Sequence, residues 1–374
     1  AAVCLSVGIL MIAALPVSKV GYDEETHFMR SMEIASIPWG MNVSSAVWSK
    51  MIPSLNDWPE NQPGSREEQA AIEDYFNQEG DYKNGSLHPD SVTPVLSIPA
   101  YAGQALVLKV CKGLGIPFGM MIRLGRLGNL LVYAAVMFFA IKKTPVGKVI
   151  MSVIGLLPTS VFMACVYSYD PAVMAWIYLS MALLLKEILT PEEKISWKSY
   201  ALILITFVLG CSAKAVYAPM ILIGLLLPES KFQNRQQKIA MRLGFVLVLF
   251  GLLSTFVLPV LLAPKATGDL RGGDTSEVGQ MSYILGNPIA YAQILFRNIF
   301  HDLPDFVLGK DVFSVQGHLA ASGFTWISTA LAVYTIVTDT KTTAPERLSV
   351  KQKIWIFFML GGAVLLVWTS MYIA

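Results

Sequence analysis

The sequence has little charge. Asp, Glu, Lys and Arg make up only 14% of its 374 residues, against roughly 25% in a typical soluble domain. Hydrophobic residues make up 54%, and they gather in blocks of about twenty, the length of a helix that crosses a bilayer core of about 30 Å. An ordinary soluble protein is therefore excluded, and the blocks predict an all-α polytopic membrane protein. The net charge of +2 gives no indication of nucleic-acid binding.

Cysteine is also scarce, and its spacing excludes the usual cysteine-based sites. The four thiols belong to no CxxC motif and to no Cys/His ligand pair, so neither a zinc site nor a disulfide framework is indicated. All four lie in or beside apolar blocks, which predicts buried structural thiols. They are Cys4, Cys111, Cys165 and Cys211.

Nine apolar segments follow one another along the chain, and we expect about nine to eleven membrane spans in a single transmembrane domain over 1–374. Both chain ends lie inside apolar segments, so we expect a piece of a longer protein. One segment is too long for a single span and has a polar break at Ser212–Lys214, which predicts two short helices. The segments are 1–18, 93–113, 120–141, 147–167, 170–189, 199–227, 239–263, 320–338 and 354–374.

Charge is divided unequally among the connections. Residues 19–92 hold 13 of the 26 acidic residues, whereas four short connections hold 14 of the 28 Lys and Arg. Basic residues in short loops mark the cytoplasmic side. We therefore expect 19–92 and 264–319 to be outward-facing loops, the first carrying interfacial helices and the second an amphipathic helix near 287–303.

This topology conflicts with a full membrane pass by every segment between 93 and 141. The basic connection KKTPVGK at 142–148 would then face outward, against the charge rule. The Pro-broken stretch VTPVLSIPAYAGQ at 92–104 is the candidate for a re-entrant or interfacial segment, because irregular backbone at membrane depth needs protein or water around it.

The outward stretch 19–92 begins close to an acidic turn, in the sequence VSKVGYDEETHFMR. A helix is predicted from near Asp23, with acids in its first turn. Asp23 and His27 lie at i and i+4 and so share one face, with Glu24 beside them. A carboxylate near apolar walls can act as a general base. The alternative is the acidic first turn of an interfacial helix, whose partly apolar face holds Phe28, Met29, Met32 and Ile34.

No cofactor is expected. A divalent cation held by Asp23, Glu24 and His27 stays open, although these residues have no specific spacing signature.

Three further charged residues are candidates for a site. Lys214 lies at the break in 199–227, where a charge at membrane depth usually faces a cavity; the alternative is a lysine that extends to the membrane surface. Arg126 could hold a phosphate with two parallel hydrogen bonds, or anchor a helix at the interface. Asp170 precedes Pro171 at the start of a segment, and capping of that helix is the preferred interpretation.

Five stretches occur in an order that resembles a family of predicted bacterial polytopic membrane proteins of unknown function. They are GYDEETHFMRSMEIAS, RLGNLLVYAAVMFFAIKKTP, LLPTSVFMACVYSYDPAVMA, SAKAVYAPMILIGLLLP and YILGNPIAYAQILFRNIF. The resemblance covers nearly the whole chain, with Tyr22 in place of the proline in the family's Pro-Asp-Glu motif. The family in turn resembles the GT-C glycosyltransferases, multispan enzymes with an acidic motif in the first outward loop.

The resemblance implies a GT-C-like bundle that transfers a sugar from a polyprenyl-phosphate donor to a cell-envelope glycan or lipid. The reaction would take place at the outer face of the bacterial plasma membrane, in contact with membrane lipids and without nucleic acid. Asp23, or failing it Glu24, would deprotonate the acceptor hydroxyl. Cations would stabilise the leaving phosphate, and other side chains would orient the base or the sugar. The implied roles are Lys214 and Arg126 for phosphate, Tyr217 for the lipid groove, and His27 and Asp170 for orientation.

Two other functions stay open. Broken helices and charges at membrane depth are also features of transporters, so a transporter or flippase for a lipid-linked saccharide is the first alternative. A non-catalytic subunit of polysaccharide assembly is the second. The sequence indicates neither the sugar nor the acceptor.

Overall fold

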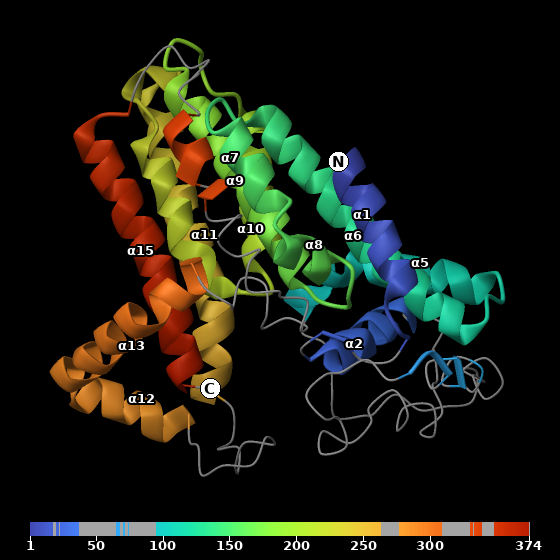
Figure 1. Cartoon of the computed structure of the whole chain (residues 1–374). Helices are drawn as coiled ribbons and strands as arrows, with labels where there is room; N and C mark the ends of the chain where they lie inside the picture. The colour runs from blue at the N-terminus through green and yellow to red at the C-terminus, as the bar shows by residue number, and fades with distance from the viewer. Residues whose placement is uncertain are drawn as a thin grey trace. The chain divides into compact units, whose positions relative to one another are not determined.

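The computed structural model describes residues 1–17, 20–21, 23–36, 65–67, 70–71, 74, 95–262, 277–308, 330–331, 333–338 and 348–373. Within these residues all regular structure is helical and no strand occurs (Figure 1), so the all-α prediction is confirmed. The chain divides into two compact units, each described here by itself. The first is Ala1–Lys142, Gly147–Leu179 and Gly309–Thr340; the second is Lys143–Val146, Ser180–Leu308 and Lys341–Ala374.

The first unit is built from short helices around one long one. A proline breaks the block 147–167, which the sequence predicted as one span, because proline lacks an N–H and restricts the residue before it. Leu157, before Pro158, accordingly leaves the helical region, with ψ 138°. The helices are α1 (Ala2–Ala14), α2 (Glu24–Ser36), a 3-10 turn η1 (Val95–Ser97), α5 (Ile98–Gly113), α6 (Phe118–Lys143), α7 (Lys148–Gly155), α8 (Pro158–Ala164) and the start of α9 (Asp170–Leu189).

Helix α2 belongs to the core of this unit. Phe28, Met32 and Ala35 form its buried stripe, spaced as one face of a helix. They pack against Leu108 of α5 and other apolar side chains of α5 and α6. Met29 and Ile34, which the sequence placed on the apolar face, are only half-buried. The core thus fixes the direction in which the acidic first turn of α2 points.

Two glycines let α5 and α6 approach closely. A Cβ atom added to Gly103 or to Gly128 would collide with the backbone carbonyl of the other. Small residues at a crossing allow such backbone contact between helices of membrane proteins. One turn earlier on α6, Gly125 leaves room for the ring of Tyr167.

The second unit confirms the break in 199–227. Helix α10 (Trp197–Cys211) ends just before Ser212, and η2 (Ala215–Leu226) follows as a 3-10 helix of 12 residues with Pro219 inside it. Helix η2 packs against α10, α11 and α15, and Trp355 Nε1 donates a hydrogen bond to Leu222 O at 3.0 Å. The other helices are η3 (Glu229–Lys231), α11 (Arg235–Leu262), α12 (Glu277–Gly286), α13 (Pro288–Leu308) and α15 (Val350–Ile373); α13 confirms the helix predicted near 287–303.

Four helices in the described part of the chain are long and apolar enough to cross a membrane: Phe118–Lys143, Asp170–Leu189, Arg235–Thr255 and Val350–Ile373. Three shorter apolar helices accompany them: Ala2–Ala14, Trp197–Cys211 and Ala215–Leu226. Helix α5 is in neither group, and the expectation that one segment between 93 and 141 makes no full pass stays a prediction.

Much of the predicted outward loops, 19–92 and 264–319, lies outside the described residues, as does most of the predicted segment 320–338. The count of about nine to eleven spans, the GT-C-like arrangement and the single domain stay predictions.

Candidate functional site

Two adjacent carboxylates at the start of α2 lie in opposite environments. Asp23 is exposed, and its backbone is left-handed, with φ 51°. Asp is among the few residues other than glycine that tolerate this region. Glu24 is only 3% exposed. The left-handed turn therefore separates two neighbours, one facing the surroundings and one facing the protein.

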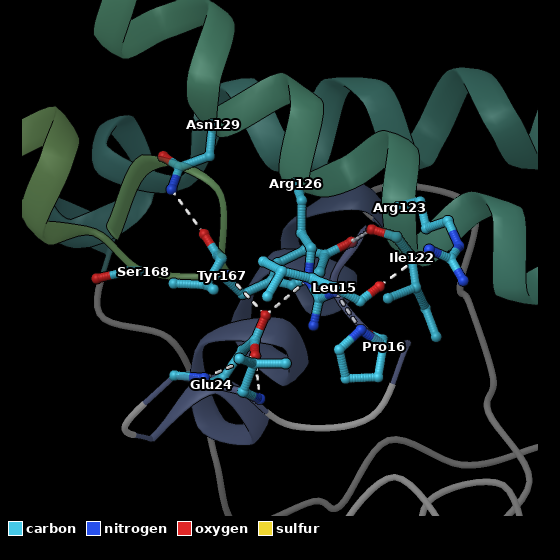
Figure 2. A network of polar contacts seen from close by, with 12 residues as sticks. Leu15, Pro16, Glu24, Ile122, Arg123, Arg126, Asn129, Tyr167 and Ser168 are labelled. Carbon is cyan, nitrogen blue, oxygen red and sulfur yellow. Dashed lines mark hydrogen bonds and ion pairs between the residues drawn. The ribbon is translucent and has the colours of Figure 1, made fainter. Parts of the chain in front are cut away.

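The Glu24 carboxylate accepts four hydrogen bonds (Figure 2). Oε1 accepts from Arg126 Nε at 2.9 Å and from Tyr167 N at 3.0 Å. Oε2 accepts from Val20 N at 2.7 Å and Gly21 N at 3.0 Å. A buried carboxylate is tolerated when a cation and hydrogen bonds replace its lost water. Glu24 thereby ties the residues before α2 to α6 and to the loop that follows α8.

One face of α6 holds backbone carbonyls of the neighbouring segments. Arg123, Arg126 and Asn129 lie three residues apart on this face, and each donates to carbonyls that no helix satisfies. Arg126, 1% exposed, binds Pro16 O in addition to Glu24. Among the other carbonyls are Leu15 O, 2.9 Å from Arg123 Nη1, and Val166 O, 2.8 Å from Asn129 Nδ2.

A polar and aromatic group, here named the His27 cluster, consists of His27, Arg30, Tyr101, Tyr169 and Asp170. Nδ1 of His27 is 2.8 Å from the Tyr101 hydroxyl, which also accepts a hydrogen bond from Arg30 Nη1 at 3.4 Å. The ring of Tyr169 meets the His27 ring edge-on, with 4.9 Å between centroids. Burial raises the pKa of Tyr101 to about 12, and the charge of Asp170 adds to this rise while Arg30 opposes it. The phenol therefore stays protonated and available as a hydrogen-bond donor.

A chain of hydrogen bonds holds the His27 cluster in place. Ser31 Oγ lies 2.8 Å from His27 O and 2.6 Å from Gln104 Oε1, and its single hydroxyl hydrogen is shared between these two acceptors. Gln104 Nε2 donates to Ser168 O, and Ser168 Oγ accepts from Asp170 N at 3.1 Å. Helix α2, helix α5 and the turn before α9 are thus joined through buried polar groups.

The first unit brings together five of the residues singled out in the sequence. Asp23 directly precedes α2, and Glu24 and His27 lie at the start of that helix. Arg126 binds Glu24, and Asp170 belongs to the His27 cluster. Because Glu24 and Arg126 are buried against each other, their predicted roles toward substrate gain no support from this geometry. Their proposed roles stay predictions.

Lys214 and Tyr217 belong to the second unit. Lys214 is half-buried at the residue before η2, and Tyr217 N donates to Lys214 O at 3.4 Å. The predicted contacts of these two residues with phosphate and lipid stay predictions.

Sequence reasoning missed three members of the His27 cluster. Arg30 lies three residues after His27, and this helical spacing was a usable signal. Tyr169 directly precedes Asp170. Tyr101 lies in the Pro-broken stretch 92–104, whose prolines predict an irregular backbone but indicate no role for this side chain. Their meeting depends on contacts between residues more than seventy positions apart, which local patterns do not encode.

The cysteines are free and buried, as predicted. Among the described residues, no group of three or more His, Cys, Asp and Glu side chains could hold a metal ion. The expectation that the protein has no resident cofactor stays a prediction.

The sequence profile of a family described as predicted membrane proteins, DUF2142, matches residues 5–374. Neither a curated protein nor a solved structure matches the chain. The matched range includes the acidic turn, the His27 cluster and the break before η2. The chain therefore belongs to the DUF2142 family of membrane proteins, whose function is unknown.

Proposed function

We propose that this chain is a membrane glycosyltransferase of the GT-C type. It transfers a sugar from a polyprenyl-phosphate donor to a cell-envelope glycan or lipid at the outer face of a bacterial plasma membrane. The observation that carries the proposal is the exposed Asp23 carboxylate, presented by a left-handed turn that the buried Glu24–Arg126 pair holds in place.

The reaction needs one base at the acceptor. Asp23 accepts the proton of the acceptor hydroxyl, whose oxygen then bonds to the anomeric carbon of the sugar. The bond between that carbon and the phosphate oxygen breaks, and polyprenyl phosphate leaves with the electron pair. A single displacement of this kind inverts the configuration at the sugar.

Glu24 has a positioning role in this proposal. Its four hydrogen bonds hold the carboxylate turned inward, against Arg126. Asp23 can then face the substrate without a second carboxylate competing for the acceptor proton. This arrangement favours Asp23 over Glu24 as the base.

The leaving phosphate needs a cation that can reach it. Arg126 is 1% exposed and is engaged by Glu24 and Pro16 O, so we assign the contact in the first unit to Arg30, which is half-buried in the His27 cluster. The sequence-based proposals, Lys214 for phosphate and Tyr217 for the lipid groove, are kept separate from this contact because both residues belong to the second unit. His27 and Asp170 orient the base or the sugar.

The outward placement of the site rests on the connections. The turn before α2 is bonded directly to the loop before α9 through Glu24 and Tyr167, so these two segments lie on the same side of the membrane. Helix α9 is long enough to cross, and the connection 190–198 at its end holds Lys194 and Lys198 together with two Glu. Because Lys and Arg in short connections mark the cytoplasmic side whatever the acidic count, this alternation supports an outward Asp23.

Turnover by the purified, reconstituted full chain tests the proposal, with release of polyprenyl phosphate from a panel of lipid-linked sugars as the readout. Asp23→Asn should lower kcat by roughly 10²–10⁴-fold, the usual contribution of a general base, and leave donor binding unchanged. Glu33→Gln is the matched control, because it removes a carboxylate from the same helix and should leave kcat unaltered. Full turnover by Asp23→Asn would overturn the assignment.

A broken helix at η2 keeps transport as the second candidate. The same vesicles discriminate between the two. A chain that moves lipid-linked saccharide across the bilayer without releasing polyprenyl phosphate is a flippase, and this outcome rejects the glycosyltransferase proposal.

A further inference from the structure

The exposed side of α13 carries an apolar stripe. Ile289, Phe296 and Phe300 fall within roughly 40° of one another at about 100° per residue. Their side chains are 77%, 55% and 70% exposed, and the two phenylalanine rings stack with 6.3 Å between centroids. Leu285, near the end of α12, is likewise 75% exposed. Such contiguous exposed apolar side chains mark an interaction surface.

The rest of the α13 circumference divides into two further sectors. Gln293, Arg297 and His301 form an exposed polar stripe directly beside the apolar one. The opposite side packs on protein: Tyr291 is buried and donates a hydrogen bond to Thr369 Oγ1 at 2.7 Å. Its ring also meets that of Tyr372, with 5.2 Å between centroids. A helix that packs on one side and is amphipathic on the other has the pattern of an interfacial helix.

The contact of Tyr291 with α15 fixes the position of the apolar stripe along that helix. Helix α15 is a candidate span, and large apolar side chains along it, such as Phe357 at 72%, are exposed to the surroundings. Thr369 lies near the C-terminal end of α15, whereas Lys351 and Lys353 lie at its start. Figure 1 shows α12 and α13 beside that C-terminal end. The stripe therefore lies beside the end of a candidate membrane span, at the end away from Lys351 and Lys353.

We propose that the α12–α13 hairpin is a membrane-surface anchor whose ligand is the phospholipid bilayer. Leu285, Ile289, Phe296 and Phe300 insert between acyl chains of the outer leaflet, and Arg297 lies among the lipid phosphates. Aromatic side chains are favoured at this boundary. This anchor is independent of glycosyl transfer, and it fixes the second outward loop in the plane where lipid-linked molecules lie.

Nitroxide labels on the full chain in phosphatidylcholine/phosphatidylglycerol liposomes test the anchor. Phe296→Cys and Phe300→Cys place a label in the apolar stripe, and His301→Cys places one in the polar stripe. The unlabelled background is provided by the parent chain, whose four cysteines are buried. Collision with oxygen, which concentrates in lipid, is compared with collision with a water-soluble nickel chelate.

Labels at 296 and 300 should collide more often with oxygen than with the chelate, and the label at 301 should show the reverse. An unchanged thermal midpoint of each variant shows that the fold is kept. If all three positions collide mainly with the chelate, the stripe faces water and the proposal is overturned. If 296 and 300 are shielded from both reagents, a protein surface covers the stripe, and the lipid anchor is equally rejected.

Discussion

Each unit contains a buried ion pair. In one pair the carboxylate accepts the additional backbone hydrogen bonds, and in the other the lysine donates them. In the first unit Glu24 lies 2.9 Å from Arg126, and the carboxylate collects three backbone N–H groups besides. In the second unit Glu187 lies 2.6 Å from Lys231, and here the cation donates to Thr190 O at 3.0 Å. Lys194 acts alike, donating to Ser230 O at 2.8 Å.

The local backbone explains the difference. Residues before a helix and its first turn offer N–H groups without partners, whereas the last turn offers carbonyls. A carboxylate therefore organises the start of α2, and lysines organise the end of α9 and the turn η3, where the helix dipole also favours a cation. Beside the first pair, the carboxylate of Asp23 stays exposed. In the second unit, the hydrogen bonds of Lys231 and Lys194 join the residues after α9 to the segment around η3.

The largest effect should come from removing the cation of the first pair. Arg126→Met leaves the Glu24 carboxylate buried without its partner, which should lower the free energy of unfolding by about 3–5 kcal/mol. Unfolding of the purified protein in detergent measures the change. Arg123→Met is the matched control on the same helix face, and it should cost clearly less because it leaves no carboxylate buried. Equal losses in the free energy of unfolding would show that the Glu24–Arg126 pair contributes no more than the contacts of Arg123.

The first pair also depends on the close crossing of α5 and α6, since α2 packs on α5 while Arg126 lies on α6. Gly128→Ala places a methyl group against the Gly103 carbonyl and should cost roughly 1–3 kcal/mol, the usual range for overpacking. Gly113→Ala is the control on α5, because a Cβ there meets nothing within 4 Å. If both variants unfold at the same midpoint, the crossing tolerates more space than its geometry indicates.

Removing the cation of the second pair should cost less than removing Arg126. In Lys231→Met, the Glu187 carboxylate is already 13% exposed and can regain water, so we expect a loss of about 1–3 kcal/mol, the cost of unsatisfied polar groups. The same unfolding measurement applies. Lys238→Met removes a lysine from an exposed pair with Glu229 and should change stability less than Lys231→Met does, because water screens an exposed pair. A larger loss for Lys238→Met would reverse the comparison.

The smallest expected effect is the loss of stability at low pH from the exposed Lys238–Glu229 pair. A hydrogen bond from Lys238 and its charge lower the pKa of Glu229 below its usual range. The stability that this pair contributes is therefore present above the ordinary glutamate pKa and is lost as pH falls through the lowered value. Unfolding midpoints of the parent and of Glu229→Gln should converge on acidification. A difference that grows toward low pH would contradict the sign.

The sequence predicted the apolar architecture well because span length and polarity are local properties. Helix α9 occupies 170–189 as predicted, and the break before η2 is marked by Lys214 within an apolar run. The prediction failed for 147–167, where Pro158 interrupts a block that composition alone reads as continuous.

The site was less predictable. Asp23, Glu24 and Arg126 were all recognised as candidates, but the chain does not show that Glu24 and Arg126, 102 positions apart, would neutralise each other. Nor does it show that a left-handed residue would turn Asp23 away from Glu24. Both facts depend on tertiary packing, which local spacing leaves undetermined.

The 3-10 winding of η2 has a consequence for reach. Twelve residues extend about 24 Å at roughly 2.0 Å per residue, but only about 18 Å as an α-helix. The tighter coil thus covers most of a bilayer core with few residues. Near its far end η2 is held by the bond from Trp355 to Leu222 O, so rewinding to an α-helix would draw its other end inward by about 6 Å. Lys214, the residue at that end, would move by the same distance along the helix axis.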